Sequence, residues 1–514
     1  MNGDEELAEG WAVMPLGDVI EPGGLFDGPF GSNLKTDDYT DSGVRVIRLE
    51  NLANLHFVAE KETFISEAKY RTLTKHTVGR NDILVGSFVD GAVRVCVLPE
   101  LKTKAIAKAD CFCVRTDTRV MNRKFAALQL GRSATKDALV EEIHGATRPR
   151  ITTKQLRGLA VAVPPIHEQH RIVEKVEALL AEVNKAKDRL DRVKVILKRF
   201  RQAVLAAACS GKLTEEWRKT TSCPPSRAAI DALLARQGEA KTRRGVPDAV
   251  ERPESLAEFE PPDTWLCVSV AECLRSGALI DVKDGNHGAN HPKVADFTPS
   301  GLPFITAAQV GRFLIDYDGA YRISGKPLKA LRVGFARPGD AILTHKGSVG
   351  RSALCSRECV LTPQTTYYRA EPSVIESEFL VYWFAAPWFY AQLAAVMSQT
   401  TRDFVPISEQ YNLFLVLPPL PEQREIIRLL RGLLTLADTF EARLTAATTR
   451  AERLPQSILS KAFKGELVPT EAELARAEGR SFESAEEMLT RVRGTGVEAL
   501  ALGNRRRRGR QRAG

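Results

Sequence analysis

Two long stretches of the chain carry apolar residues at alternating spacings of three and four. The first stretch runs from Ile172 to Val204 and the second from Ile426 to Ile458. Ten apolar positions at these spacings form a heptad seam, which is typical of a helix that packs along another helix. The pattern therefore predicts two long helices that pair as a coiled coil. The seam includes Ile172, Val176, Leu179, Val183, Leu190 and Leu197 in the first helix and Ile426, Leu430, Leu433, Phe440, Leu444 and Leu454 in the second.

Proline pairs mark the start of each predicted helix. Pro164–Pro165 and Pro418–Pro419 end the apolar run before each seam, because proline disfavours helix at the residue that precedes it. The helices are then expected to begin at Glu168 and Glu422, where a negative charge suits the positive end of the helix dipole. The span from Glu168 to Phe200 alone gives a helix of about 50 Å, too long to pack on one small domain.

Glycine and proline also mark the ends of the helices. Gly211 and Gly465 stand where C-terminal stops are expected. Pro455 is expected to kink or break the second helix near its end, since proline removes a helical hydrogen bond.

The two seams belong to an internal repeat. Residues 147–213 align without a gap on residues 401–467 at a constant offset of 254, so that Arg148 falls on Arg402. Trp11 and Trp265 stand at the same offset. A repeat of this length indicates that the whole chain is built from two similar halves.

The segments before each helix predict mixed α/β domains. Short β-type runs alternate with helical pieces and are punctuated by glycine and proline, as at Ser42–Gly43 and its echo Ser300–Gly301. The β-type runs are 44–49, 82–85, 93–98, 304–306, 341–344 and 360–361, and the helical pieces are 124–130 and 378–396. The expected fold class is α/β (mixed α+β), with two tandem domains separated by a pair of long helices that form an antiparallel coiled coil.

These patterns divide the chain into six segments. The expected domains are 11–163 for the first recognition domain, 164–213 for the first helical region, 218–262 for a linker, 263–417 for the second recognition domain, 418–467 for the second helical region and 468–514 for a C-terminal extension.

Composition places the protein among soluble globular chains. The sequence is 44% hydrophobic and 27% charged, and no apolar run approaches the roughly 20 residues of a membrane span. The acidic N-terminus does not resemble a secretory signal, so a cytoplasmic protein is expected. Nine scattered cysteines without a C-x-x-C pair are expected to be reduced thiols.

The net charge of +9 says little about the folded part of the chain. Six of these charges are arginines near the C-terminus, which leaves +3 for the rest. We expect this tail to be solvated and to add non-specific affinity for phosphates. Its arginines are Arg505, Arg506, Arg507, Arg508, Arg510 and Arg512.

Three segments together resemble the specificity subunits of type I restriction-modification systems. They are PPIHEQHRIV at 164–173, PPLPEQREII at 418–427 and QSILSKAFKGEL at 456–467. The resemblance covers 11–467 and implies two DNA target-recognition domains held by an antiparallel coiled coil. It further implies a bacterial or archaeal protein that reads a bipartite double-stranded DNA site. Such a protein would be associated with the nucleoid because it binds DNA. Methyltransferase subunits, two by the repeat, and a restriction and translocase subunit would be its partners.

Signatures of catalysis are missing from the sequence. It contains no Asn/Asp-Pro-Pro-aromatic motif for base methylation, no glycine-rich turn for S-adenosylmethionine and no G-x-x-x-x-G-K-[ST] loop for ATP. We therefore expect no catalytic residue, no metal ligand and no cofactor on this chain, with S-adenosylmethionine, ATP and Mg²⁺ on the partner subunits. A nuclease-methyltransferase with the same architecture and a tandem-domain binding module of another class remain alternatives.

The best candidates for DNA contact are polar and basic residues on glycine-rich loops, because base edges are read mainly by arginine, lysine, asparagine and glutamine. The strongest are those just before the strand that leads into each helix. The candidates are Thr147, Arg148, Arg150, Asn33 and Lys35 in the first half and Thr401, Arg402, His345, Lys346, Ser348, Arg351 and Gln364 in the second.

Overall fold

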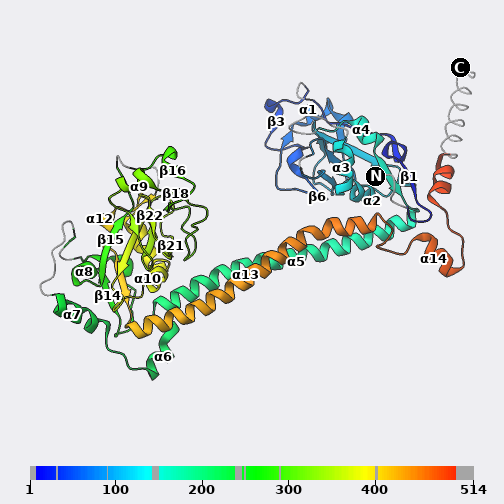
Figure 1. The fold of residues 1–514 in the computed structure, drawn as a ribbon. Coiled ribbons are helices and arrows are strands. Elements are labelled where there is room, and N and C mark those ends of the chain that lie inside the picture. The colour runs from blue at the N-terminus through cyan, green and yellow to red at the C-terminus, as the bar shows by residue number, and fades with distance from the viewer. Residues whose placement is uncertain are drawn as a thin grey trace, which may run out of the picture. The chain divides into compact units, whose positions relative to one another are not determined.

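The computed structural model describes residues 7–30, 33–89, 91–141, 150–237, 246–247, 250–288, 291–399 and 403–493. The chain divides into two compact units, Met1–Leu190 with Ala446–Gly514, and Asp191–Thr445. Each unit combines a mixed α/β domain with one end of each of two long helices, α5 (Ile166–Cys209) and α13 (Leu420–Ala462) (Figure 1). The predicted fold class is confirmed.

The described residues of the first unit contain thirteen strands and five helices besides the long ones. The strands are β1 (Ala12–Pro15), β2 (Ile20–Phe26), β3 (Tyr39–Thr40), β4 (Val44–Ile47), β5 (Leu52–Ala53), β6 (His56–Phe57), β7 (Phe64–Ile65), β8 (Thr77–Val78), β9 (Ile83–Gly86), β10 (Val95–Val97), β11 (Ala105–Ala107), β12 (Cys111–Thr116) and β13 (Ala160–Val163). The helices are α1 (Glu67–Arg71), α2 (Arg123–Leu130), α3 (Ser133–Glu141), α4 (Thr153–Gly158) and α14 (Glu471–Glu478).

The second unit is built in the same way. Its strands are β14 (Leu266–Ser269), β15 (Leu279–Asp284), β16 (Phe297–Thr298), β17 (Leu302–Ile305), β18 (Tyr321–Ile323), β19 (Phe335–Ala336), β20 (Ala341–Thr344), β21 (Ser352–Leu354), β22 (Cys359–Leu361), β23 (Thr365–Ala370), β24 (Ser398–Gln399), β25 (Asp403–Phe404) and β26 (Phe414–Leu417). Its helices are α6 (Glu215–Thr220), α7 (Ser226–Gln237), α8 (Val270–Ser276), α9 (Gly325–Ala330), α10 (Ser377–Phe384), α11 (Pro387–Val396) and α12 (Ile407–Gln410).

The two domains share one sheet topology. A four-stranded sheet has the order β10-β9-β12-β2 in the first domain and β21-β20-β23-β15 in the second. A five-stranded sheet has the order β3-β7-β4-β11-β8 in the first and β16-β18-β17-β22-β19 in the second, each with a single parallel pair. The duplication seen in the helices therefore extends through the more divergent part of the chain.

In each four-stranded sheet, one inner strand is buried on both faces. This strand, β9 in the first domain and β20 in the second, is here called the central strand. In β9, Ile83 and Val85 face the core beneath α2, while Leu84 faces a second core between the sheets. In β20, Leu343 and Ile342 divide in the same way. Both strands therefore lie between two cores, which accounts for their uninterrupted apolar runs.

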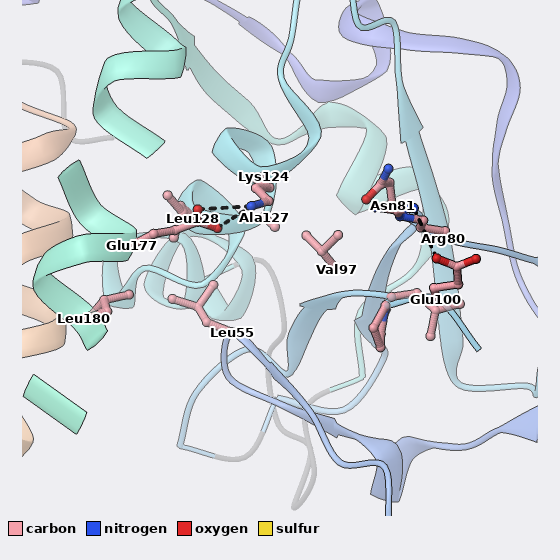
Figure 2. A pocket seen from close by; sticks show the side chains of 12 residues that line it. Leu55, Arg80, Asn81, Val97, Glu100, Lys124, Ala127, Leu128, Glu177 and Leu180 are labelled. Atoms are coloured by element: carbon pink, nitrogen blue, oxygen red, sulfur yellow. Dashed lines mark hydrogen bonds and ion pairs between the residues drawn. The ribbon is translucent and has the colours of Figure 1, made fainter. Parts of the chain in front are cut away.

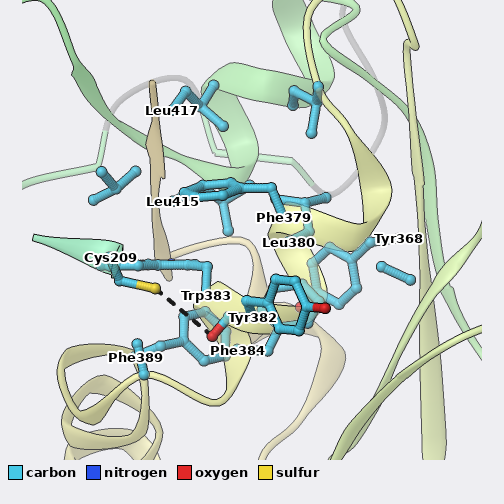
Figure 3. Close-up of a cluster of buried hydrophobic side chains, with 14 of the residues drawn as sticks. Cys209, Tyr368, Phe379, Leu380, Tyr382, Trp383, Phe384, Phe389, Leu415 and Leu417 are labelled. Atoms are coloured by element: carbon cyan, nitrogen blue, oxygen red, sulfur yellow. Dashed lines mark hydrogen bonds between the residues drawn. The ribbon is translucent and has the colours of Figure 1, made fainter. Parts of the chain in front are cut away.

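The end of α5 is part of the core of the second domain. Cys209 is fully buried there, and its thiol donates to the backbone oxygen of Tyr382 at 3.8 Å (Figure 3). Trp383, the largest fully buried side chain among the described residues, donates through its indole to Phe414 O at 3.0 Å. Burial raises the pKa of the Cys209 thiol, as expected for a thiol in an apolar core. All nine cysteines are free.

The end of α13 has the equivalent role in the first domain. Phe463, just beyond α13, packs on Phe125 of α2 with ring centroids 4.9 Å apart. The chain that follows α14 adds Ala485 and Met488 to the same core. The C-terminal extension is therefore packed against the first domain as far as residue 493.

The long helices begin two residues earlier than predicted, at Ile166 and Leu420. The reason is that proline restricts only the residue before it, so a helix can start directly after the second proline of each pair. The predicted stops are confirmed, since Gly211 and Gly465 have left-handed φ values of +80° and +75° just beyond the helices. The helix does not break at Pro455, since α13 continues through this residue.

Only one row of each predicted seam is closely packed. In α13, Leu430, Ala437, Leu444 and Ala451 repeat every seven residues and are at most 7% exposed. The other row is more open, and its members Phe440 and Leu454 are 49% and 39% exposed. In α5, Val176, Val183 and Val204 are buried, Leu190 and Leu197 are half-buried, and Val193 is 38% exposed. A pair of helices covers one line of each helix and leaves the next line at the rim.

The helix predicted over 378–396 is two helices. It breaks at Pro387, which is the first residue of α11. The proline ring is tolerated there because the first turn of a helix lacks a hydrogen-bond partner for its N–H groups. Within the described residues, no single helix has the length and apolar character of a membrane span. The helices α10 and α11 reach that length and apolar character only when they are taken together, and they are bent by 65° relative to each other.

Candidate nucleic-acid interface

A Trp–Glu hydrogen bond anchors each domain to its long helix. Trp11 Nε1 donates to Glu168 Oε1 at 2.8 Å, and Trp265 Nε1 donates to Glu422 Oε2 at 2.8 Å. Both carboxylates are almost completely buried. The glutamate of the sequence motif therefore fixes the first strand of the domain on the start of the helix.

The glutamine of the same motif fixes the other side of each helix start. Gln169 Nε2 donates to Pro164 O and Val120 O, both at 2.8 Å, and its Oε1 accepts from Asn122 N at 2.8 Å. Gln423 makes the equivalent three contacts in the second domain. These contacts give both domains one common frame.

A part-buried ion pair holds the turn that leads into β9 in the first domain and into β20 in the second. Asp82 is 3% exposed and binds the guanidinium of Arg115 at 2.7 and 2.9 Å. Asp340 binds Arg369 at 2.7 and 2.8 Å in the second domain. Both aspartates also accept a backbone N–H three residues earlier, so each holds the turn into its central strand.

The loop that follows the central strand is held in the same way in both domains. Ser87 N donates to Asp110 O, and His345 N donates to Gln364 O, both at 2.9 Å. Ile151 N donates to Ser87 O at 2.8 Å, and the equivalent bond in the second domain, to His345 O, measures 2.9 Å. The backbone frame is therefore the same while the side chains at these positions differ.

Of the predicted DNA contacts at 147–150, Arg150 is the one within the described residues. It pairs with Asp110 at 2.5 Å, and its guanidinium lies 5.6 Å from the centre of the Phe88 ring. Its side chain is 47% exposed. Arg150 also lines a cavity of about 600 Å³ with Phe26, Phe30 and other residues.

The same region contains a second carboxylate. Burial raises the pKa of Asp27, and the nearby charge of Asp110 raises it further. The charge of Arg150 lowers the pKa of Asp27. Asp110, which pairs with Arg150 at 2.5 Å, restricts the position of the guanidinium.

Asn33 and Lys35 are exposed, as expected for surface candidates. Asn33 N donates to Phe30 O at 2.8 Å, which places Asn33 next to the cavity beside Arg150. Lys35 N donates to Asp38 Oδ2 at 2.7 Å in a short 3-10 turn.

The second domain brings four of its candidates together. His345, Lys346 and Ser348 lie on the loop between β20 and β21, and Gln364 accepts the backbone N–H of His345. Lys346 pairs with Phe404 across a β-bridge, and its Nζ lies 5.4 Å from the centre of that ring.

His345 is 2% exposed, so it differs from the other candidates. Its Nδ1 lies 3.0 Å from Val405 O and must carry the proton, because a carbonyl oxygen only accepts. Its Nε2 has no hydrogen-bond partner among the described residues. Burial lowers the pKa of His345, which keeps the ring neutral at neutral pH.

Arg351 ends the same loop but faces a different region. It lines a cavity of about 320 Å³ with Leu205 of α5 and Phe313. Arg351 therefore lies near the long helix.

Four predicted contacts lie outside the described residues. They are Thr147, Arg148, Thr401 and Arg402, and the arginines of the C-terminal tail lie outside as well. The described chain resumes at Arg150 in the first domain and at Asp403 in the second, directly after these candidates.

Phe88, Asp110 and Phe404 were not among the predicted residues. A lone aromatic or acidic residue in a loop carries no local signal, and only the sheet pairing brings these side chains to Arg150 and Lys346. The signal available in the sequence was positional, because Asp110 and Gln364, like Arg150 and Phe404, stand 254 residues apart.

A further cavity lies where the first domain meets α5. It measures about 470 Å³, and Leu55, Val97, Leu128 and Leu180 form its apolar wall (Figure 2). The salt bridge between Lys124 Nζ and Glu177, at 2.7 Å, closes one side. This cavity is a feature of the helix side of the domain and not of its loops.

Part of the chain matches a known protein family. Residues 8–194 match the family model described as the type I restriction modification DNA specificity domain. The chain is also similar to two specificity subunits of type I restriction enzymes from Escherichia coli. It is 25% identical to the EcoKI subunit over 473 residues, 90% of each chain, and 27% identical to the EcoBI subunit over 325 residues. The latter match covers 62% of this chain and about three fifths, 61%, of the EcoBI subunit.

Solved structures show the same fold. The HsdS subunit of Thermoanaerobacter tengcongensis aligns with a TM-score of 0.52 and 18% identity, over 90% of this chain and 99% of that one. A chain from a structural study of type I R-M complex assembly aligns with a TM-score of 0.59 and 20% identity over the same shares.

Proposed function

We propose that this chain is a specificity subunit of a type I restriction-modification system, which recognises a split DNA sequence and leaves the chemistry to partner subunits. Each α/β domain reads one half of the target. The chain itself supplies no catalytic group.

One observation supports this proposal most strongly. The two domains repeat the same buried frame, formed by Trp11, Glu168 and Gln169 in the first and by their counterparts in the second. The loop side chains at equivalent positions differ, as Asp110 and Gln364 do. Two equal frames with different loop side chains are suited to reading two different half-sites.

The partners follow from the same reasoning. Methyltransferase subunits bind this chain, and the twofold repeat favours two copies. A restriction and translocase subunit joins them. S-adenosylmethionine, ATP and Mg²⁺ bind to these partners. The complex acts on cellular DNA in the cytoplasm of a bacterium or archaeon.

Single-molecule sequencing of genomic DNA tests the proposal. The strain that carries the gene should show one bipartite methylated motif, and deletion of the gene should remove methylation from that motif alone. An unchanged methylation pattern after deletion would reject the proposal. Reintroduction of the gene on a plasmid is the control and should restore the motif.

A further inference from the structure

Three residues occupy equivalent backbone positions around the loop after the central strand of each domain. In the first domain they are Phe88, Asp110 and Arg150, here called the first cluster. In the second domain the same backbone positions hold Lys346, Gln364 and Phe404, here called the second cluster.

The backbone equivalence is supported by matching contacts. Phe88 bridges Arg150 in antiparallel fashion, and Lys346 bridges Phe404 in the same way. One residue earlier on each loop, a backbone N–H donates at 2.9 Å to the carbonyl of Asp110 in one domain and of Gln364 in the other. The residues therefore occupy corresponding backbone positions, although none of the three residue types is shared.

The two clusters exchange their cation and their ring. In the first cluster the ring is on the loop after the central strand and the cation on the opposite segment, with 5.6 Å between Arg150 Cζ and the ring centre. In the second cluster Lys346 is on that loop and Phe404 is opposite, with 5.4 Å from Nζ to the ring centre. Both clusters thus present a cation oriented by an aromatic face.

The polar member of each cluster suits a different base. Asp110 fixes one edge of the Arg150 guanidinium at 2.5 Å and leaves its other N–H donors for a ligand. A positioned guanidinium typically reads guanine O6 and N7. Gln364 accepts from Ala307 N at 3.1 Å, and its amide nitrogen donates to none of the described residues. A glutamine amide typically reads adenine.

We propose that the first and second clusters are the base-reading elements of the two half-sites, with Arg150 reading a guanine and Gln364 an adenine. The proposal rests on the proposed function. The exposed side chain of Arg150, beside a cavity of about 600 Å³, gives the first cluster access to a ligand.

A graft of one cluster onto the other frame tests this assignment. The triple variant Phe88→Lys, Asp110→Gln, Arg150→Phe gives the first domain the side chains of the second cluster. The full-length chain, purified with its modification partners, is used to select bound duplexes from a randomised DNA pool. We expect the graft to change the first half-site and to leave the second half-site and the spacing unchanged.

A matched control replaces another pair of first-domain residues with the residues at the equivalent positions of the second domain. Lys124→Glu with Glu177→Arg reproduces the Glu378–Arg431 pair on the helix side of the first domain. This variant should select the wild-type sequence. A graft variant that melts like the wild type and still selects the wild-type first half-site would overturn the proposal.

A single substitution keeps the test decisive if the graft fails to fold. Arg150→Lys keeps the charge and loses the planar donor set, so discrimination at one base pair of the first half-site should fall by about 5- to 150-fold while non-specific binding is retained. Unchanged discrimination at every position would contradict the proposal. If the wild-type chain itself selects no split sequence, the proposed function fails instead.

Discussion

The indole of Trp11 and the carboxylate of Glu168 form a buried hydrogen bond of 2.8 Å that spans 157 residues of sequence. The same pair recurs at Trp265 and Glu422 with the same separation. The second oxygen of each glutamate is used differently. Glu168 accepts from the backbone N–H of Glu471 at 2.8 Å, whereas Glu422 accepts from Thr214 at 2.7 Å and from Arg218. Each helix start is thus held by the segment that follows the other long helix.

Substitution of Glu168 by glutamine should therefore destabilise the first unit. The amide keeps one acceptor oxygen, but its NH₂ group then faces the N–H of Trp11 or of Glu471. We expect a loss of about 1–3 kcal/mol in the free energy of unfolding, measured by chemical denaturation. The exposed Glu174→Gln on the same helix is the control and should change stability by no more than about 0.5 kcal/mol.

The effect of Glu168 should also depend on pH. Burial raises the pKa of Glu168 above 4.5, against the hydrogen bonds from Glu471 and Trp11. A carboxyl with a raised pKa in the folded state stabilises the fold below its unfolded pKa, and this stabilisation is lost as pH rises through its folded pKa. Relative to Glu168→Gln, the wild type should gain stability as pH falls from 7 toward 4.5. If the difference in melting temperature between the wild type and Glu168→Gln stays constant or changes in the opposite direction across that range, the raised pKa of Glu168 is not the cause.

Each domain forms a salt bridge with its long helix, and the positive and negative residues of this salt bridge are swapped between the two domains. Lys124 pairs with Glu177 at 2.7 Å, and the residues 254 positions later, Glu378 and Arg431, pair with the signs reversed. Lys124→Glu alone should destabilise the first domain by placing two carboxylates together. Addition of Glu177→Arg should restore stability, with a coupling of no more than about 1 kcal/mol because both side chains are half exposed. A double-mutant cycle in urea measures the coupling, and additive single effects would argue against the pairing.

The single packed row of the coiled coil predicts unequal sensitivity to charge. Leu444 is 6% exposed and Phe440 is 49% exposed, although both belong to the predicted seam. Leu444→Asp should lower the free energy of unfolding by several kcal/mol, because it buries an unpaired carboxylate. Phe440→Asp should cost far less. Equal losses in thermal unfolding would show that both rows are packed.

The large-scale features of the fold could be predicted because they leave periodic signals. The repeat offset, the helix ends at Gly211 and Gly465 and the central strands at 83–86 and 341–344 follow from spacing and turn residues. The break at Pro387 and the exposure of Phe440 could not be inferred in the same way. A heptad pattern fixes which residues face one side, but the number of neighbouring helices decides how many of them are covered.

The candidate site was only partly predictable for a similar reason. Arg150, Lys346 and Gln364 were found from residue type and loop position, while Phe88 and Asp110 depend on strand pairing between distant segments. His345 has the residue type of a contact but is buried, because its ring is held against Val405 O. The predictions for Arg148 and Arg402 concern residues outside those described and remain predictions.

The central claim, that each domain reads one half-site on a common frame, is tested most directly by a chain with two copies of the first domain. Residues 265–417 are replaced by residues 11–163, joined at the equivalent positions Trp265 and Leu417. Genomic methylation is then mapped by single-molecule sequencing in cells that express this chain with its modification partners. The account predicts a target in which the first half-site sequence occurs in both halves. Persistence of the wild-type second half-site would contradict it.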